Sequence, residues 1–183
     1  MGMESEGFVM DLGLLILRVV FGLLMIGHGT QKLLGWFGGY GLEGSSGFVA
    51  SRGFAPAKFW TTTGSLSEAS GGLLFLLGFL SPLGSIAIAA AMLTAIVGFH
   101  WPKFWASEGG IEHALLMLTA AAAVGLAGPG AYSLDAVLGA ALPPMITGIV
   151  AALAAVGFLV SVVGAASRRR ATAAATPTQT TAA

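Results

Sequence analysis

The sequence contains no cysteine at any of its 183 positions. This absence excludes disulfide bonds, thiolate-bound zinc, cysteine-ligated iron–sulfur clusters, covalently attached haem and a thiol nucleophile. Any electron transfer in which the chain takes part therefore requires a bound cofactor or a second protein.

Charge is scarce as well. Only 9% of the residues are Asp, Glu, Lys or Arg, whereas 56% are hydrophobic and the mean hydropathy is +0.88. A soluble domain of this length needs more polar surface than that. The eight basic and eight acidic residues balance, so no global field attracts nucleic acid. We therefore expect a membrane protein that contacts the lipid bilayer and binds no nucleic acid.

Most hydrophobic residues fall in five runs that approach the length of a membrane-spanning helix. The runs are Leu12–Gly29, Phe59–Phe79, Leu83–Phe99, Ile111–Ala127 and Met145–Ala166. They predict an all-α, polytopic membrane helical bundle of five helices, the fifth a transmembrane helix over 145–166. Residues 1–11 are assigned to an N-terminal segment. Residues 167–183 are assigned to a basic tail that becomes disordered, because 171–183 lacks apolar periodicity.

Basic residues separate by side of the membrane in this five-helix scheme. Three segments carry them, namely those after the first, third and fifth runs: Lys32, Arg52, Lys58, Lys103 and Arg168–Arg170. The segments on the opposite side contain no Lys or Arg. Since Lys and Arg are retained on the cytoplasmic side, we expect the N-terminus outside and the C-terminus in the cytoplasm.

The segment between the first two runs, residues 32–58, combines glycine with aromatic residues. The aromatic residues are Trp36, Phe37, Tyr40, Phe48 and Phe54, and glycines are interleaved with them. Glycine permits tight turns, and Trp and Tyr prefer the headgroup region of a bilayer. We therefore expect a structured loop at the membrane face rather than one continuous helix.

Two charged residues, Arg18 and Glu68, lie inside the apolar runs. An ionised side chain in hydrocarbon needs a partner or a water-filled cavity. Counted from the proposed cytoplasmic ends, Arg18 is roughly 16 Å deep and Glu68 roughly 13 Å deep. We therefore expect a buried Arg18–Glu68 ion pair. Two interpretations stay open: the pair fixes helix register, or Arg18 keeps Glu68 ionised on a proton or ligand path.

All three histidines fall near the proposed cytoplasmic ends of the helices, together with other polar and aromatic residues. The set is His28, His100 and His113 with Gln31, Lys32, Trp101, Lys103 and Glu112. A polar site formed by these residues at the membrane surface suits a quinone head group whose tail lies in the bilayer. The alternative is a set of interfacial residues without a ligand. Haem is a poor fit because these histidines lie at helix ends, and the spacing indicates no metal site.

Three ordered blocks of residues carry a family resemblance. They are HGTQKLLGWFGG at 28–39, EASGG at 68–72 with GFLSPL at 78–83, and GGIEH at 109–113 with GPGAYSLD at 128–135. Over about residues 11–135 the sequence resembles the DoxX family of bacterial membrane proteins. The resemblance implies a four-helix core over residues 12–135 in the bacterial inner membrane, related to the DoxD subunit of thiosulfate:quinone oxidoreductase. The helix over 145–166 is an addition to this four-helix pattern. By position it singles out His28, Gln31, Lys32, Glu68 and Glu112.

Together these interpretations predict a subunit of a quinone-linked membrane oxidoreductase complex that has protein partners. The expected catalytic residues are Glu68, Arg18, Glu112 and His113, with Glu112 or His113 as proton relay. The expected quinone-binding residues are His28, Gln31, Lys32, His100 and Trp101. Two alternatives stay open: a non-catalytic scaffold that recruits soluble redox enzymes through residues 32–58 and 168–170, or a small-solute transporter that uses the Arg18–Glu68 seam.

Overall fold

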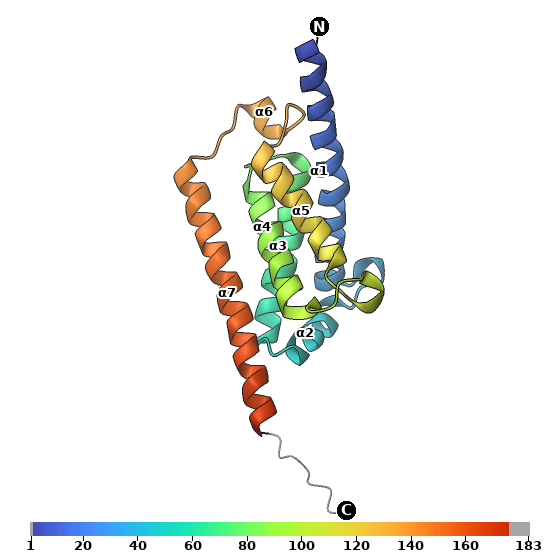
Figure 1. The fold of residues 1–183 in the computed structure, drawn as a ribbon, viewed down its shortest axis with the longest axis vertical. Coiled ribbons are helices and arrows are strands. Elements are labelled where there is room, and N and C mark those ends of the chain that lie inside the picture. Colours follow the sequence, from blue (N-terminus) through green and yellow to red (C-terminus); the bar gives the residue numbers. More distant parts are fainter. Residues whose placement is uncertain (1, 176–183) are drawn as a thin grey trace, which may run out of the picture.

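The computed structural model describes the backbone of residues 2–175 and the side chains of residues 5–175. All regular structure in this range is helical (Figure 1). The elements are α1 (Gly2–Leu34), η1 (Trp36–Gly38), α2 (Gly41–Ser51), α3 (Ala57–Leu77), α4 (Leu83–Ala95), the π-helical turn η2 (Ile96–His100), η3 (Ala106–Glu108), α5 (Glu112–Ala127), α6 (Leu134–Leu138) and α7 (Pro144–Ala175).

The five apolar runs form the five long helices α1, α3, α4, α5 and α7, which confirms the predicted all-α polytopic bundle. Segment Ser5–Leu34 of α1, α4 with η2, and α7 are each long and apolar enough to cross a membrane, whereas α5 is a shorter apolar helix. Helix α3 has 21 residues and buries Thr61, Ser65 and Glu68. These three polar side chains therefore point into the bundle rather than into lipid.

Close backbone contact holds α1 against α3, the most extensive helix pairing of the fold. A methyl group added at Gly29 would lie 2.6 Å from the Ser65 carbonyl oxygen, and one added at Gly72 would lie 2.8 Å from the Gly22 carbonyl oxygen. Such contact replaces the hydrophobic driving force that helices lack in lipid. Helix α4 lies between α3 and α5 and also contacts α7 (Figure 1).

Helix α1 is longer than the sequence predicted. Residues 2–11, assigned to a separate segment, form its first turns, and Lys32, assigned to the following loop, lies in its last turn. The predicted loop over residues 32–58 consequently contains the end of α1, then η1 and α2. Gly35, at φ 74°, reverses the chain direction after α1 in the left-handed region that favours glycine.

The tail differs from its prediction as well. Helix α7 continues to Ala175, so the expected disorder is wrong for residues 171–175. Residues 176–183, the rest of the predicted disordered tail, lie outside the described residues. An alanine-rich stretch extends a helix that is already formed, because alanine has the highest intrinsic helix propensity.

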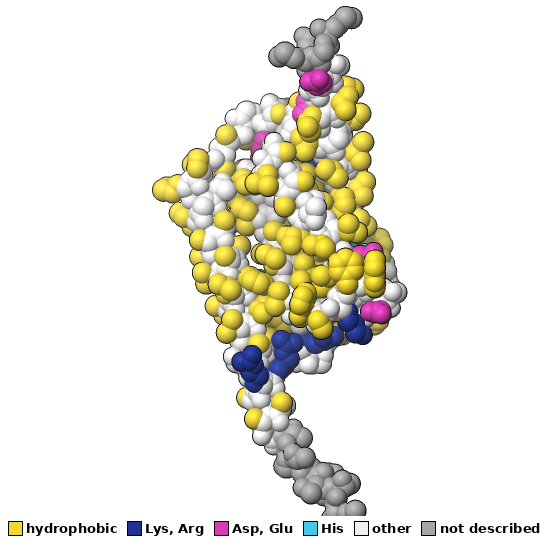
Figure 2. All heavy atoms as spheres, viewed as in Figure 1, with side chains coloured by type: hydrophobic (Ala, Val, Ile, Leu, Met, Phe, Trp, Pro, Cys, Tyr) yellow, Lys and Arg dark blue, Asp and Glu magenta, His cyan; other side chains and the backbone are white. Residues whose placement is uncertain are grey.

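Basic side chains gather at one end of the molecule, where α7 ends (Figure 2). Apolar side chains cover the flanks of the bundle between this end and the other. Helix α1 begins at the opposite end (Figure 1). Arg18 is the exception among the basic residues, because it is buried inside the bundle with 2% of its surface exposed.

Candidate functional site

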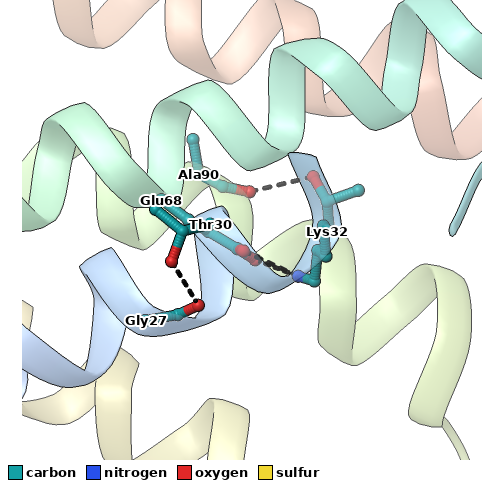
Figure 3. A network of polar contacts seen from close by, with 6 residues as sticks. Gly27, Thr30, Lys32, Glu68 and Ala90 are labelled. Carbon is teal, nitrogen blue, oxygen red and sulfur yellow. Dashed lines mark hydrogen bonds and ion pairs between the residues drawn. The ribbon is translucent and has the colours of Figure 1, made fainter. Parts of the chain in front are cut away.

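Lys32 and Glu68 form an ion pair between the last turn of α1 and the middle of α3 (Figure 3). Lys32 Nζ donates to both carboxylate oxygens of Glu68, at 2.5 Å to Oε1 and 2.7 Å to Oε2. The Glu68 side chain is only 4% exposed, whereas that of Lys32 is 42% exposed. The Lys32 ammonium thus neutralises a buried carboxylate, although the Lys32 side chain itself is partly exposed.

The position of this pair follows from the glycine contact one turn earlier. Gly29 lets the backbone of α1 approach Ser65 and Ala69 on α3. Residues three and four apart share a helix face, so Lys32 lies on the same face as Gly29. On α3, Glu68 lies on the face of Ser65. The close approach of α1 and α3 at Gly29 therefore places Lys32 within hydrogen-bond distance of the Glu68 carboxylate.

Hydroxyl groups lie close to the pair. Thr30 Oγ1 donates to the carbonyls of Ile26 at 2.9 Å and Gly27 at 3.0 Å, which satisfies it within α1 (Figure 3). Ser65 Oγ, one turn before Glu68 and 1% exposed by residue, is the buried side-chain polar atom that finds no partner in the described part of the chain. A hydroxyl can both donate and accept, so the site has an unused hydrogen-bonding group.

Two histidines border the pair. His28 precedes Lys32 by one helical turn and lies within electrostatic range of Glu68, Lys32 and His113. His113 is the second residue of α5, and both imidazoles are exposed on the surface of the bundle. Imidazole is the side chain best suited to exchange protons near neutral pH. His28, an exposed group that can carry protons, thus lies within electrostatic range of the buried ion pair and of a second exposed imidazole, that of His113.

The predicted Arg18–Glu68 ion pair is wrong. The sequence placed the end of the first helix at Gly29, but α1 continues to Leu34 and carries Lys32 to Glu68. Arg18 lies fourteen residues earlier on the same helix, roughly 21 Å along its axis. Close backbone contact at Gly22, between the two positions, packs α1 against α3.

Arg18 instead binds backbone carbonyls near the other end of the bundle. Its Nε donates to Phe75 O at 3.2 Å and its Nη2 to Leu76 O at 3.0 Å. Its Nη1 donates to Pro129 O at 2.7 Å and Tyr132 O at 3.0 Å. The carbonyls of the last helical turn have no partner within their own helix. Arg18 therefore caps α3 and joins it to the segment that follows α5.

Asp135 supports the same end, a role that the sequence did not indicate. Its two carboxylate oxygens accept hydrogen bonds from the backbone N–H groups of Leu80 and Ser81, each at 2.8 Å. It also lies within electrostatic range of Arg18. The available signal was Ser133, whose hydroxyl accepts from Ala136 N and caps α6. A serine at this position predicts where α6 begins, but it does not indicate which groups the Asp135 carboxylate binds.

Three more of the predicted site residues lie at helix ends and hydrogen-bond to the backbone of the segments between helices. Gln31 Nε2 donates to Phe37 O at 3.3 Å. His100 Nδ1 and the Gly109 carbonyl are 2.8 Å apart. Glu112 Oε2 accepts from Ala106 N at 2.8 Å. These contacts shape the loops themselves.

Trp101, the last of the predicted residues, is 66% exposed at the end of η2. The structure thus pairs Lys32 with Glu68 and places His28 within electrostatic range of both and of His113. The polar groups of His100 and Glu112 bond within the α4–α5 loop. Among the described residues no group of three His, Asp or Glu side chains is arranged to hold a metal ion.

The comparison with protein families gives one match. The family model described as DoxX matches residues 13–101. This range contains Arg18, His28, Lys32 and Glu68 and ends at Trp101, so α5, with His113, and α7 lie beyond it. No curated protein and no solved structure matches the chain.

Proposed function

This chain belongs to the DoxX family over residues 13–101, and on that premise we propose that it is the membrane subunit of a quinone-linked oxidoreductase complex. Its DoxX domain and apolar helices establish a membrane protein of the DoxX type. The observation that carries the finer proposal is the buried Glu68 held by Lys32, with His28 and His113 beside it. Buried ionisable groups in a membrane bundle are candidates for function by default.

The residues present suit a quinone head group. Its carbonyl oxygens need hydrogen-bond donors, which the partly exposed Lys32 and the exposed His28 supply. The unpartnered Ser65 hydroxyl is a further hydrogen-bonding group in the seam, one helical turn before Glu68. Leu24 lies one turn before His28 on α1 and is exposed, so an apolar tail has a lipid-facing surface to follow.

Each residue then has a distinct task. A bound quinone would take up two electrons and two protons. Lys32 and His28 orient the head group by hydrogen bonds, while Glu68 balances the charge of Lys32. His113, exposed at the start of α5, exchanges protons with water. Because the chain has no cysteine with which to bind an iron–sulfur cluster, a bound cofactor or a second protein must deliver the electrons. We propose a protein partner as their source.

The same proposal orients the chain in the bacterial inner membrane. The basic end of the bundle, with the Lys32–Glu68 pair near it, faces the cytoplasm, and the first turns of α1 lie outside. The gathering of Lys and Arg at one end supports this orientation (Figure 2). The partner that delivers electrons accordingly approaches from the cytoplasm.

The test is whether the chain binds quinone through this pair. The full chain is purified in mild detergent, its visible spectrum is recorded, and extracted lipids are quantified for quinone by mass spectrometry. Glu68→Gln and His28→Ala each remove one charged or donor group and are expected to reduce bound quinone about tenfold. Glu43→Gln is the matched control, because Glu43 forms an exposed ion pair with Lys58.

The outcomes separate the candidate functions. Stoichiometric quinone in the native chain and in Glu43→Gln, but not in the two site variants, supports the proposal. Quinone-free native protein, or equal quinone in all variants, contradicts it. A Soret band would indicate haem instead. A soluble redox partner that still binds the quinone-free chain would favour the scaffold function.

A further inference from the structure

Five basic residues at the end of the bundle where α7 finishes lack an acidic partner. We call them the basic collar: Arg52, Lys103, Arg168, Arg169 and Arg170 (Figure 2). Among the side chains that the structure describes, ion pairs form only between Lys32 and Glu68 and between Lys58 and Glu43. The collar therefore carries uncompensated positive charge.

Packing brings the arginines of the collar together from two parts of the chain. A methyl group added at Gly53 would lie 2.9 Å from Arg169 Cγ and 2.7 Å from the Ala165 carbonyl oxygen. Arg168 Nη1 donates to Ala55 O at 3.0 Å. The turn between α2 and α3 thus rests against the end of α7, and Arg52, which precedes Gly53, lies beside the arginines of α7.

Within the part of the chain that the structure describes, a ring contact holds the Arg52 guanidinium and none of its N–H groups makes a hydrogen bond. Its guanidinium carbon lies 5.3 Å from the centroid of the Phe48 ring, in a cation–π contact. The Phe48 ring in turn stacks on Phe99, with centroids 5.6 Å apart. This stack fixes the guanidinium at the collar and leaves its N–H groups available to an anion. Guanidinium forks match the oxygens of a phosphate group.

An apolar surface adjoins the collar. Val97, in η2 directly after α4, is exposed and precedes Gly98, whose carbonyl accepts a hydrogen bond from Arg169. Val160 and Val163 on α7 are also exposed, one to three helical turns before the collar arginines. A ligand that suits both features has a phosphate at one end and apolar chains at the other. We infer that the basic collar binds the headgroup of an anionic phospholipid, whose acyl chains lie along α4 and α7.

This lipid would strengthen a weak attachment. In the described part of α7 only Ser161 and Ala165 are buried, and hydrogen bonds from Arg168 and Arg169 add two further links to the core. A phosphate bound by Arg52 and by the arginines of α7 links this helix to the α2–α3 turn. The lipid then acts as a clamp, independently of the Lys32–Glu68 pair and of the proposed quinone site.

Native mass spectrometry of the full chain in detergent tests this inference directly. The protein is titrated separately with phosphatidylglycerol, cardiolipin and phosphatidylcholine. The test variant is Arg52→Gln/Arg170→Gln, which leaves intact the two arginines that hydrogen-bond to the core. Lys58→Gln is the matched control, because this lysine lies at the same end but is already paired with Glu43.

The native chain and Lys58→Gln are expected to retain the anionic lipids in preference to phosphatidylcholine. One basic residue near an anionic lipid surface contributes about fivefold in affinity, so the double variant is expected to lose about 25-fold. Circular dichroism is used to check that the double variant keeps its helix content. If it does not, Arg170→Gln alone, at an exposed side chain, is expected to lose about fivefold.

Three results would overturn the inference. The first is equal retention of phosphatidylcholine and the anionic lipids by the native chain. The second is unchanged anionic-lipid binding in the folded variant. The third is displacement of the lipid by millimolar inorganic phosphate, which would assign the collar to free phosphate. A collar that binds an acidic protein instead of lipid would give the first result.

Discussion

Arg18 and Lys32 lie about four turns apart on α1 and hold α3 at two levels. Arg18 binds the Phe75 and Leu76 carbonyls at the end of α3, whereas Lys32 binds the Glu68 carboxylate in its middle. The first interaction satisfies helix-terminal carbonyls and the second satisfies a buried charge. Helix α1 thus supplies one cation that caps the end of α3 and a second that neutralises the buried carboxylate of α3.

Loss of Lys32 is expected to destabilise the protein through its partner. Lys32→Met leaves the Glu68 carboxylate buried without a counter-charge, which costs about 3 kcal/mol in the free energy of unfolding. Lys58→Met breaks an exposed pair and should change it by less than about 0.5 kcal/mol. Equilibrium unfolding in mixed micelles measures both. Equal effects of the two substitutions would refute a special role for the buried pair.

Arg18 is expected to tolerate no substitution, including lysine. Arg18→Lys keeps the charge but offers one nitrogen to carbonyls that three guanidinium nitrogens now reach. Since a hydrogen bond to a charged group contributes about 1.5 to 3 kcal/mol, a loss of about 3 kcal/mol or more is expected. Thermal unfolding monitored by size-exclusion chromatography tests this, with the exposed Arg170→Lys as control. A native-like melting temperature for Arg18→Lys would contradict the capping role.

Gly29 and Gly27 give a matched pair for the α1–α3 contact. A methyl at Gly29 would lie 2.6 Å from Ser65 O, whereas one at Gly27 meets nothing within 4 Å. Gly29→Ala should therefore cost about 1 to 3 kcal/mol through overpacking. Gly27→Ala should be neutral or stabilising by up to about 1 kcal/mol, because alanine favours the helix. If both variants unfold alike, the close backbone approach is not what positions α1.

The expected orientation can be measured with single cysteines, because the native chain has none. Leu138→Cys lies in α6 at the end opposite the basic collar, and Ala171→Cys follows the arginines of α7. A membrane-impermeant maleimide should label Leu138→Cys in cells with a permeabilised outer membrane. It should label Ala171→Cys only after the inner membrane is opened. The reverse pattern would invert the proposed topology.

The helices could be predicted from the sequence because apolar runs of this length have few other stable structures. Hydropathy locates Leu83–Phe99 or Met145–Ala166 without knowledge of their neighbours. The importance of Glu68 was equally accessible, since a carboxylate in an apolar run needs a partner. Such inferences depend on single segments and on the cost of burying charge.

The partner of Glu68 could not be predicted in this way. Lys32 follows the apolar run, and a lysine at that position is equally consistent with a loop. Only the continuation of α1 through Gly29, together with the close approach that this glycine permits, selects Lys32 over Arg18. The acceptors of Arg18 are backbone carbonyls, which every residue possesses, so no side-chain pattern marks them.

The contacts of Arg18 also constrain the order in which the molecule can be completed during synthesis. Its acceptors at Phe75 and Leu76 are made 57 and 58 residues after it, and those at Pro129 and Tyr132 follow 111 and 114 residues after it. Until then the guanidinium depends on water or on the insertion machinery for hydrogen bonds. Helix α1 is synthesised before α3 and α5 and is nevertheless among the last of the described helices to reach its final environment.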